Sequence, residues 1–230
     1  MMKFLRIALN EYKPNQHKRR KELKLKAIHY YKQAHAGTAG LWATMYADKP
    51  YGKKLYDAIT GHIASLSTRC AYCQDKIFHN ANLNVDHILP AKIYPQFVFC
   101  YSNLTVSCVT CNAIKSDTDY FSLKPAGNLY PDSNHPWSCF HPNHQLYAGH
   151  IDRFVIQTNH INLRAYIGST PGGKVLCRDL LSKVSEFETK SIANPRVASA
   201  IENLGNYIAK YPADTKESLN KLIAAMAQHI

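Results

Sequence analysis

The chain has 230 residues, of which 46% are hydrophobic and 19% are charged. This size and composition predict a folded protein with a substantial core and argue against a disordered chain. Lys and Arg number 28 against 16 Asp and Glu, so the net charge is +12. Residues 1–60 hold 13 of the basic and 4 of the acidic side chains, which places +9 of that charge in the first quarter. Such a segment favours a polyanion such as nucleic acid, although a solvated helix face carries the same pattern.

Membrane insertion and secretion are both disfavoured by the sequence. No apolar run approaches the roughly 20 residues that a membrane-spanning helix needs. The N-terminal run MMKFLRIALNEYK is interrupted by Arg6, Asn10 and Glu11, which argues against a signal peptide. We therefore expect a cytoplasmic protein. The seven cysteines are odd in number, so a disulfide framework is not expected in this compartment.

The first part of the chain reads as helical. KRRKELKLKAIHYYKQA, residues 18–34, has strong helix formers and no Gly or Pro, and AGTAG at 36–40 ends it. A second helix is predicted over 53–66, where apolar residues recur at helical spacing. The sequence thus predicts a basic helical N-terminal region over residues 1–66.

The pattern changes after residue 66. Cysteine pairs and short β-rich stretches predict a separate core over 67–125, and residues 126–230 read as a mixed loop and helical C-terminal region. In that last region we expect short strands, a loop at STPGG and three further helices. The strands are predicted at 153–157 and 160–166, the loop at 169–173, and the helices at 174–192, 194–210 and 214–229.

Two CxxC pairs predict a zinc site. RCAYC contributes Cys70 and Cys73, and SCVTC contributes Cys108 and Cys111. Zinc takes four soft ligands at tetrahedral corners, and each CxxC turn supplies two of them with little strain. The alternative is a set of reduced, buried cysteines. The other three, Cys100, Cys139 and Cys177, have no CxxC partner and are expected to be core or loop thiols; CFHPNH at 139–144 is a weaker metal candidate.

The segment between the cysteine pairs carries residues suited to phosphodiester hydrolysis. NVDHILP places Asp86 and His87 side by side, and an imidazole near its ordinary pKa can take a proton from water. Asp86 and Asn112 offer the oxygen ligands that a hard divalent cation prefers. Asn103 can brace the loop that carries His87, and Lys115 follows Asn112 by one helical turn.

These motifs, taken in order, resemble the HNH endonuclease family. CxxC, DHILP, NL, CxxCN and K span about 50 of the 230 residues. The resemblance implies an α+β fold: a ββα-metal HNH core with a four-cysteine zinc site, flanked by mostly helical extensions. It also implies metal-dependent hydrolysis of nucleic acid, with DNA favoured as the substrate over structured RNA such as tRNA.

The resemblance also assigns roles by position. It implies His87 as the general base, and Asp86 and Asn112 as ligands of a catalytic metal, usually Mg²⁺. It implies Asn103 as the residue that orients the base-bearing loop and Lys115 as a phosphate contact. One departure is that Asn112 stands where the family name has its final His, and its amide oxygen is compatible with Mg²⁺.

The layout around the core suggests a narrower resemblance, to the HNH subunit (PtuB-like) of Septu-type and retron-associated antiphage systems. That resemblance implies an ABC-type ATPase partner and an antiviral role. Two functions then remain open for the basic N-terminal region. It either binds the phosphate backbone of nucleic acid or binds a partner protein. Two alternatives for the function also stay open. One is a non-catalytic, zinc-stapled module that binds nucleic acid or a partner, and the other is a stand-alone restriction or homing-type HNH nuclease.

Overall fold

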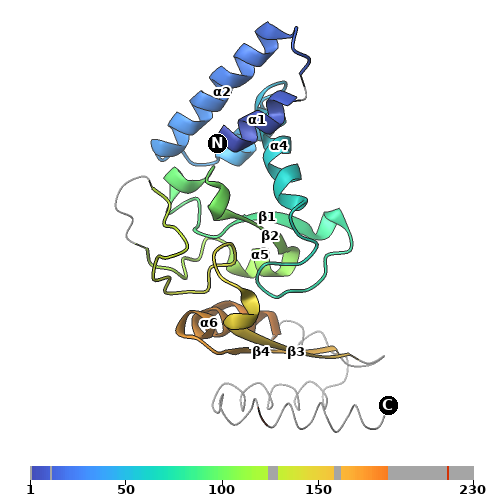
Figure 1. Ribbon diagram of the computed structural model, residues 1–230, viewed down its shortest axis with the longest axis vertical. Coiled ribbons are helices and arrows are strands. Elements are labelled where there is room, and N and C mark those ends of the chain that lie inside the picture. Colours follow the sequence, from blue (N-terminus) through green and yellow to red (C-terminus); the bar gives the residue numbers. More distant parts are fainter. Residues whose placement is uncertain (1, 11, 124–128, 158–161, 186–216, 218–230) are drawn as a thin grey trace. The chain divides into compact units, whose positions relative to one another are not determined.

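The computed structural model describes residues 2–10, 12–123, 129–157, 162–185 and 217 (Figure 1). The chain divides into two compact units. The first runs to Trp137 and includes His141–Gln145, and the second contains Ser138–Phe140 and the described residues from Leu146 onward. Within the described ranges, no helix combines the length and apolarity needed to cross a membrane. The division into regions 1–66, 67–125 and 126–230 stays a prediction.

Four helices form the N-terminal part of the first unit. They are α1 (Met2–Asn10), α2 (His17–His35), α3 (Leu41–Ala47) and α4 (Gly52–Ala64). Gly37 and Gly40, both at positive φ, separate α2 from α3, which confirms the predicted helix break. The predicted helices at 18–34 and 53–66 are confirmed as α2 and α4, whereas α3 was not foreseen. The helices pack together through fully buried side chains, among them Phe4, Leu23, Met45, Leu55 and Ile59.

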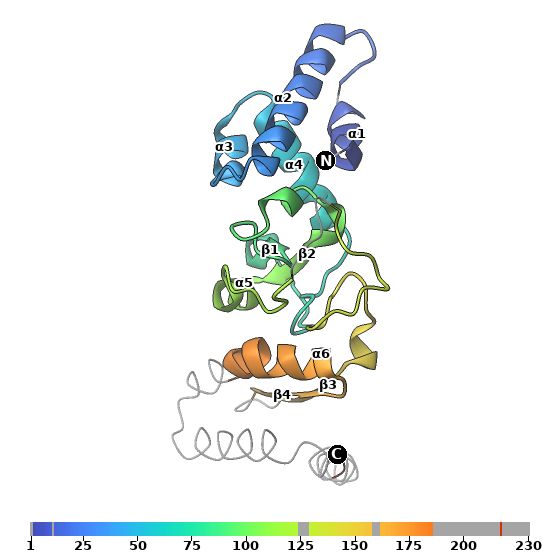
Figure 2. The same cartoon turned by 90° about the vertical axis from the view of Figure 1, so that its left-hand side faces the viewer.

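A ββα element follows the helices (Figure 2). Strand β1 (Leu83–His87) pairs antiparallel with β2 (Leu104–Cys108), and α5 (Val109–Lys115) begins directly after β2. The register places Asp86 opposite Thr105 and His87 opposite Leu104. Leu104 and Val106 belong to the same hydrophobic cluster as the N-terminal helices. The helices and the ββα element therefore share one core, which brings α3 and α4 to the end of β1.

The link between β1 and β2 covers residues 88–103 and contains two 3₁₀ turns. They are Pro95–Phe97 and Tyr101–Asn103, and each contains a buried residue, Phe97 in the first and Asn103 in the second. The first unit is completed by an aromatic group in which Tyr130, Trp137 and His141 contact one another. These contacts cover the face of the link that carries Asn103, because the Tyr130 hydroxyl lies 3.3 Å from its Oδ1.

The second unit is built on a hairpin and a helix. Strand β3 (Ile151–Gln157) pairs antiparallel with β4 (Asn162–Gly168), and α6 (Pro171–Leu176) continues through a π-helical turn, Cys177–Leu181. The two predicted strands are confirmed with slightly shifted bounds.

The predicted loop at 169–173 is wrong, because Thr170 caps a helix there: its hydroxyl accepts a hydrogen bond from Gly173 N at 3.2 Å. Gly173 is required at this position, since a Cβ would lie 2.0 Å from the His150 carbonyl oxygen. Apart from residue 217, the predicted helices over 194–210 and 214–229 and the end of the one over 174–192 lie outside the described residues.

Candidate active site

The four cysteines of the two CxxC pairs come together in one cluster. The Sγ atoms of Cys70, Cys73, Cys108 and Cys111 all lie within 4.8 Å of one another. The Sγ atoms of Cys73 and Cys108 are 3.8 Å apart. A tetrahedral zinc site with Zn–S bonds of about 2.3 Å has edges of about 3.8 Å, so the cluster fits a structural zinc ion.

Local structure explains why the cysteines meet. The backbone N–H of Ala71, inside the first pair, donates to the carbonyl oxygen of Val106 on β2 at 2.9 Å. Cys108 ends β2 and caps α5, where its Sγ accepts a hydrogen bond from the backbone N–H of Cys111 at 3.4 Å. Hydrogen bonds from the other three thiols lower the pKa of Cys108, which favours the thiolate that a metal binds. The cluster thus joins the start of the ββα element to its helix.

His87 is the last residue of β1, and the residue is 9% exposed. Its Nε2 lies 3.0 Å from the carbonyl oxygen of Val98. A carbonyl can only accept, so this contact requires the ring hydrogen on Nε2 and leaves the lone pair on Nδ1. Burial lowers the pKa of His87 below its ordinary 6.5, although Asp86 opposes that shift. The ring is therefore neutral at pH 7, the state that a general base needs.

Asp86, the neighbour of His87, is held by two side chains. The Tyr72 hydroxyl donates to Oδ2 at 2.6 Å, and the ammonium of Lys115 lies 3.2 Å from the same oxygen. Lys115 also donates to the backbone carbonyl of His87 at 2.7 Å. These bonds tie the first cysteine pair and the last turn of α5 to the end of β1. Metal-binding carboxylates are commonly oriented by such neighbouring donors.

Asn103 braces the loop that follows His87. Its Oδ1 accepts from the backbone N–H of Leu89 at 2.7 Å. Its Nδ2 donates to the carbonyl oxygens of Leu89 at 3.1 Å and Phe97 at 3.2 Å. Asn103 is fully buried, so its loss would leave three backbone groups without these partners. The amide thereby holds both ends of the segment that presents the Val98 carbonyl to His87.

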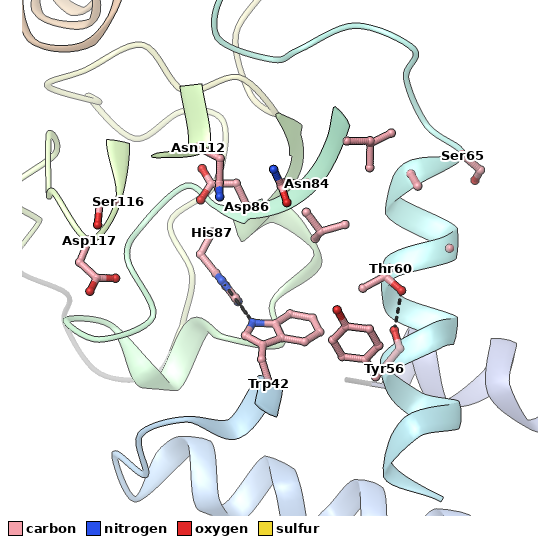
Figure 3. Close-up of a pocket in the computed structure, with 14 residues that line it drawn as sticks. Trp42, Tyr56, Thr60, Ser65, Asn84, Asp86, His87, Asn112, Ser116 and Asp117 are labelled. Atoms are coloured by element: carbon pink, nitrogen blue, oxygen red, sulfur yellow. Dashed lines mark hydrogen bonds between the residues drawn. The ribbon is translucent and has the colours of Figure 1, made fainter. Parts of the chain in front are cut away.

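A cavity of about 830 Å³ opens beside these residues. Asp86 and Asn112 both line it. The His87 ring extends toward Trp42 (Figure 3). The carboxylate of Asp86 and the amide oxygen of Asn112 are ligands that fit a divalent cation such as Mg²⁺. The Lys115 ammonium already balances part of the Asp86 charge. The walls come from α3, α4, β1 and α5 and include Trp42, Tyr56, Thr60, Asn84, Ser116 and Asp117.

One predicted role does not fit the structure. Lys115 was expected to contact phosphate, yet its side chain is 1% exposed and its ammonium is bonded to Asp86 and to the His87 carbonyl. A group enclosed in this way is out of reach of a nucleic-acid backbone, so Lys115 positions Asp86 instead. Of the other predicted residues of the site, His87, Asp86 and Asn112 line the cavity, whereas Asn103 does not.

Three aromatic residues of the site were missed by the sequence analysis. Tyr56 lies on α4, which the sequence predicted as a helix, whereas Trp42 lies on α3, which was not foreseen. No spacing rule links either residue to β1. Tyr72 lies inside the first CxxC pair, and its position next to predicted metal ligands was the signal that could have identified it.

Cys139 is buried and, together with Cys177, belongs to the second unit. Among the described residues, the one cluster of three or more potential ligands from His, Cys, Asp and Glu is the four-cysteine group.

Comparison with protein families agrees with this geometry. Residues 70–118 match the family model described as HNH endonuclease. The match begins at Cys70 and extends past Lys115, so it contains both cysteine pairs, the β1 end and α5. Neither the curated proteins nor the solved structures gave a match to the chain. Residues 70–118 therefore form an HNH domain with a four-cysteine cluster, and this domain supports a nuclease-type function.

Proposed function

We propose that the protein is a metal-dependent endonuclease that hydrolyses phosphodiester bonds in nucleic acid. The observation that carries the proposal is the neutral, carbonyl-anchored imidazole of His87 in one cavity with Asp86 and Asn112. An imidazole of this kind suits proton transfer from water, and the two oxygen ligands suit a divalent cation. A bound cation would neutralise charge on the phosphate and on the leaving oxygen.

The residues of the chain have distinct tasks in this reaction. His87 accepts a proton from water as the water oxygen forms its bond to phosphorus and the bond to the leaving oxygen breaks. The leaving oxygen takes its proton from solvent. Asn103 and the Val98 carbonyl hold the imidazole, and Tyr72 and Lys115 hold the carboxylate of Asp86. The zinc proposed for the cysteine cluster would fix the frame and take no part in the chemistry.

The charge of the N-terminal region supports a nucleic-acid substrate. On α2, the exposed side chains include Lys18, Lys21, Lys24 and Lys32, and the helix holds one acidic residue, Glu22. Nucleic-acid backbones bind such surfaces by counterion release, which makes affinity fall steeply with salt. A protein partner with an acidic face remains the competing use of the same helix.

The direct test is cleavage by purified wild type and His87→Ala. Each is incubated with Mg²⁺ and supercoiled plasmid, single-stranded DNA or bulk tRNA, with EDTA as the metal-free arm. We expect wild type to cut at least one substrate and His87→Ala to lose about 100-fold or more of the rate, the range of general base catalysis. His79→Ala, an exposed histidine outside the cavity, is the matched control and should cut like wild type.

The outcomes separate the competing functions. Equal cutting by wild type and His87→Ala would remove His87 from the mechanism. Nucleic-acid binding without cutting by any protein would favour the non-catalytic module. The species that is cut identifies the substrate, with DNA expected ahead of structured RNA.

We also propose that this nuclease serves bacterial antiviral defence in the cytoplasm, beside an ABC-type ATPase. The proposal is supported by the order of the regions, with a basic helical region before the HNH domain and a long region after it. The sequence stretches DHILP and SNL…CNAIKSD support it as well. In that case cleavage should rise when an ABC-type ATPase partner is added. A rate that is already full without the ATPase would favour the stand-alone nuclease.

A further inference from the structure

A row of aromatic rings leads from His87 along the helices α3 and α4. The ring centroid of Trp42 lies 5.4 Å from that of His87 and 5.3 Å from that of Tyr56. Tyr46 follows, with its centroid 5.2 Å from that of Tyr56. Figure 3 shows Trp42 between His87 and Tyr56. Trp42, Tyr56 and Tyr46 are called the aromatic row below.

The aromatic row presents ring surface to the cavity and to solvent. Trp42 and Tyr56 are half-buried, and both line the cavity. Tyr46 is 53% exposed. Neighbouring rings of the row are not stacked in parallel, because their planes meet at 87° and 71°. Exposed aromatic surface beside a cavity is typical of a binding site.

The α4 side of the cavity is neutral. The side chains from α4 and its end that line the cavity are aromatic, hydroxyl-bearing or small: Tyr56, Thr60, Gly61, Ala64 and Ser65. Among the described residues that line the whole cavity, none is Lys or Arg, and two are Asp. A phosphate group therefore finds no positive side chain on this wall. The neutral parts of a nucleotide, its base and its sugar, suit the wall better.

Unpaired bases have the surface that an aromatic wall can contact. In a duplex each base face is covered by the neighbouring base pair, so a ring reaches that face only after the bases unstack. In a single strand the faces are free. Proteins that bind single strands combine aromatic rings for the bases with a positively charged surface for the phosphates. In this chain residues 1–60, which include α3 and α4, supply a net charge of +9.

We propose that the substrate is a single-stranded stretch of nucleic acid, whose unpaired bases pack against the aromatic row on the way to His87. This inference rests on the proposed function, because it names the substrate class of the same site. All three rings lie outside residues 70–118, so the preference comes from helices that the HNH domain does not contain. Every base has a flat face, so the row predicts little dependence on sequence.

The test measures binding and needs no cleavage. Fluorescence anisotropy at physiological salt, without added divalent metal, gives the Kd of four labelled probes of equal length. They are a mixed-sequence single-stranded DNA without self-complementarity, the same sequence as RNA, the same sequence as duplex DNA, and a base-free oligodeoxyribose phosphate. The base-free strand keeps the phosphates of a single strand but offers no base to a ring. Phosphate contacts and base contacts are thereby separated.

Five purified proteins are compared: wild type, Tyr46→Ala, Tyr46→Phe, Tyr56→Leu and Phe78→Ala. Phenylalanine at position 46 keeps the ring, whereas alanine removes it. Phe78→Ala is the matched control, because Phe78 is an exposed ring with the Lys76 ammonium 5.1 Å from its centroid. Tyr46 has Lys53 in the same relation at 5.4 Å, but Phe78 lies outside the aromatic row. Thermal unfolding of each protein checks the fold.

We expect wild type to bind the single-stranded DNA or the RNA at least about fivefold more tightly than the duplex and the base-free strand. Tyr46→Ala and Tyr56→Leu should each weaken binding of that single strand by about 5- to 150-fold, the range for loss of one stacked base. Tyr46→Phe and Phe78→Ala should bind like wild type. The Kd of the base-free strand should be the same for all five proteins, because it has no base to lose.

Either single strand, if bound more tightly than the duplex, supports the proposal, and the tighter of the two identifies the sugar. Single strands bound no more tightly than the duplex would overturn it. Single-strand binding that neither Tyr46→Ala nor Tyr56→Leu weakens would overturn it as well. Both results would leave the proposed chemistry at His87 standing. Equal cutting by wild type and His87→Ala would instead overturn the proposed function and leave the binding result in place.

Discussion

Lys115 and Asp86 form a buried ion pair. Lys115 is 1% exposed and Asp86 is 7% exposed, and Tyr72 is the additional partner of the carboxylate. Burying an ammonium and a carboxylate is costly unless each keeps well-placed partners. Here the pair also holds the carbonyl of His87. At the scale of the residue, the Asp86 carboxylate that lines the cavity is thus held by Lys115 and Tyr72, which do not line it.

Replacing Lys115 with Met should destabilise the protein by about 3 kcal/mol, since it leaves the Asp86 carboxylate buried with its main countercharge removed. Urea unfolding measures the change. Lys92→Met is the matched control, because Lys92 is exposed, and it should change stability by about 0.5 kcal/mol or less. Equal unfolding midpoints for the two variants would contradict the structural role of Lys115.

The cysteine cluster connects the first CxxC turn to the end of β2 and to α5. Helix α5 has seven residues, and the first CxxC turn belongs to no helix or strand. Short elements of this size are marginal without tertiary support. The bond from Ala71 N to Val106 O, and the capping of α5 by Cys108, place all four thiols around one point. At this scale a zinc ion would supply the stability that the elements lack.

Replacing Cys73 with Ser should lower zinc content from about one ion per chain to near zero and lower the melting temperature, because structural zinc contributes directly to folding. Metal analysis after dialysis and thermal unfolding provide the two readouts. Cys100→Ser changes a cysteine outside the cluster and should retain zinc. A strong chelator added to wild type should reproduce the effect of Cys73→Ser. Wild type purified without zinc and unaffected by chelator would favour four reduced cysteines.

In the first unit, the buried His141 couples stability to pH. Burial lowers the pKa of His141 to about 3, with the neighbouring His144 as a second cause. Its Nε2 lies 2.6 Å from the Tyr130 hydroxyl, and Tyr130 also contacts Asn103. The unfolded chain binds a proton at His141 near pH 6.5, whereas the folded chain does so only near pH 3. Between these values the unfolded state binds more protons, so stability falls as pH falls.

We therefore expect His141 to contribute a loss of up to about 1.4 kcal/mol of unfolding free energy per pH unit between pH 6 and pH 4. Urea unfolding of wild type and His141→Gln over this range measures it. The cysteine cluster would also lose a metal in acid, so the informative quantity is the difference between the two proteins. The wild-type curve should be steeper, and parallel curves would show that His141 titrates normally in the folded state.

Much of the architecture was predictable because its signals are local. Helix-forming runs and the glycines at 37 and 40 fix α2 and its end, and the CxxC spacing fixes two knuckles. The α6 start at Pro171 was missed, because Thr170 and Pro171 were interpreted as loop residues when they form a cap and a first turn. Helix α3 was missed as well, since seven residues are too few for a periodic pattern.

By itself, the sequence determined the HNH domain and its chemical groups: four thiols in two pairs, an Asp-His step, and the amides of Asn103 and Asn112. These are short-range spacings, and their chemistry follows from residue type. Only the tertiary structure decided which groups hold the residues of the site in place and which residues from distant parts of the chain line the cavity. The Lys115 ammonium bonds the His87 carbonyl, 28 positions earlier in the chain. Trp42 contacts His87 from 45 positions away. Contacts over such separations are set by packing in a shared core, which no local pattern encodes.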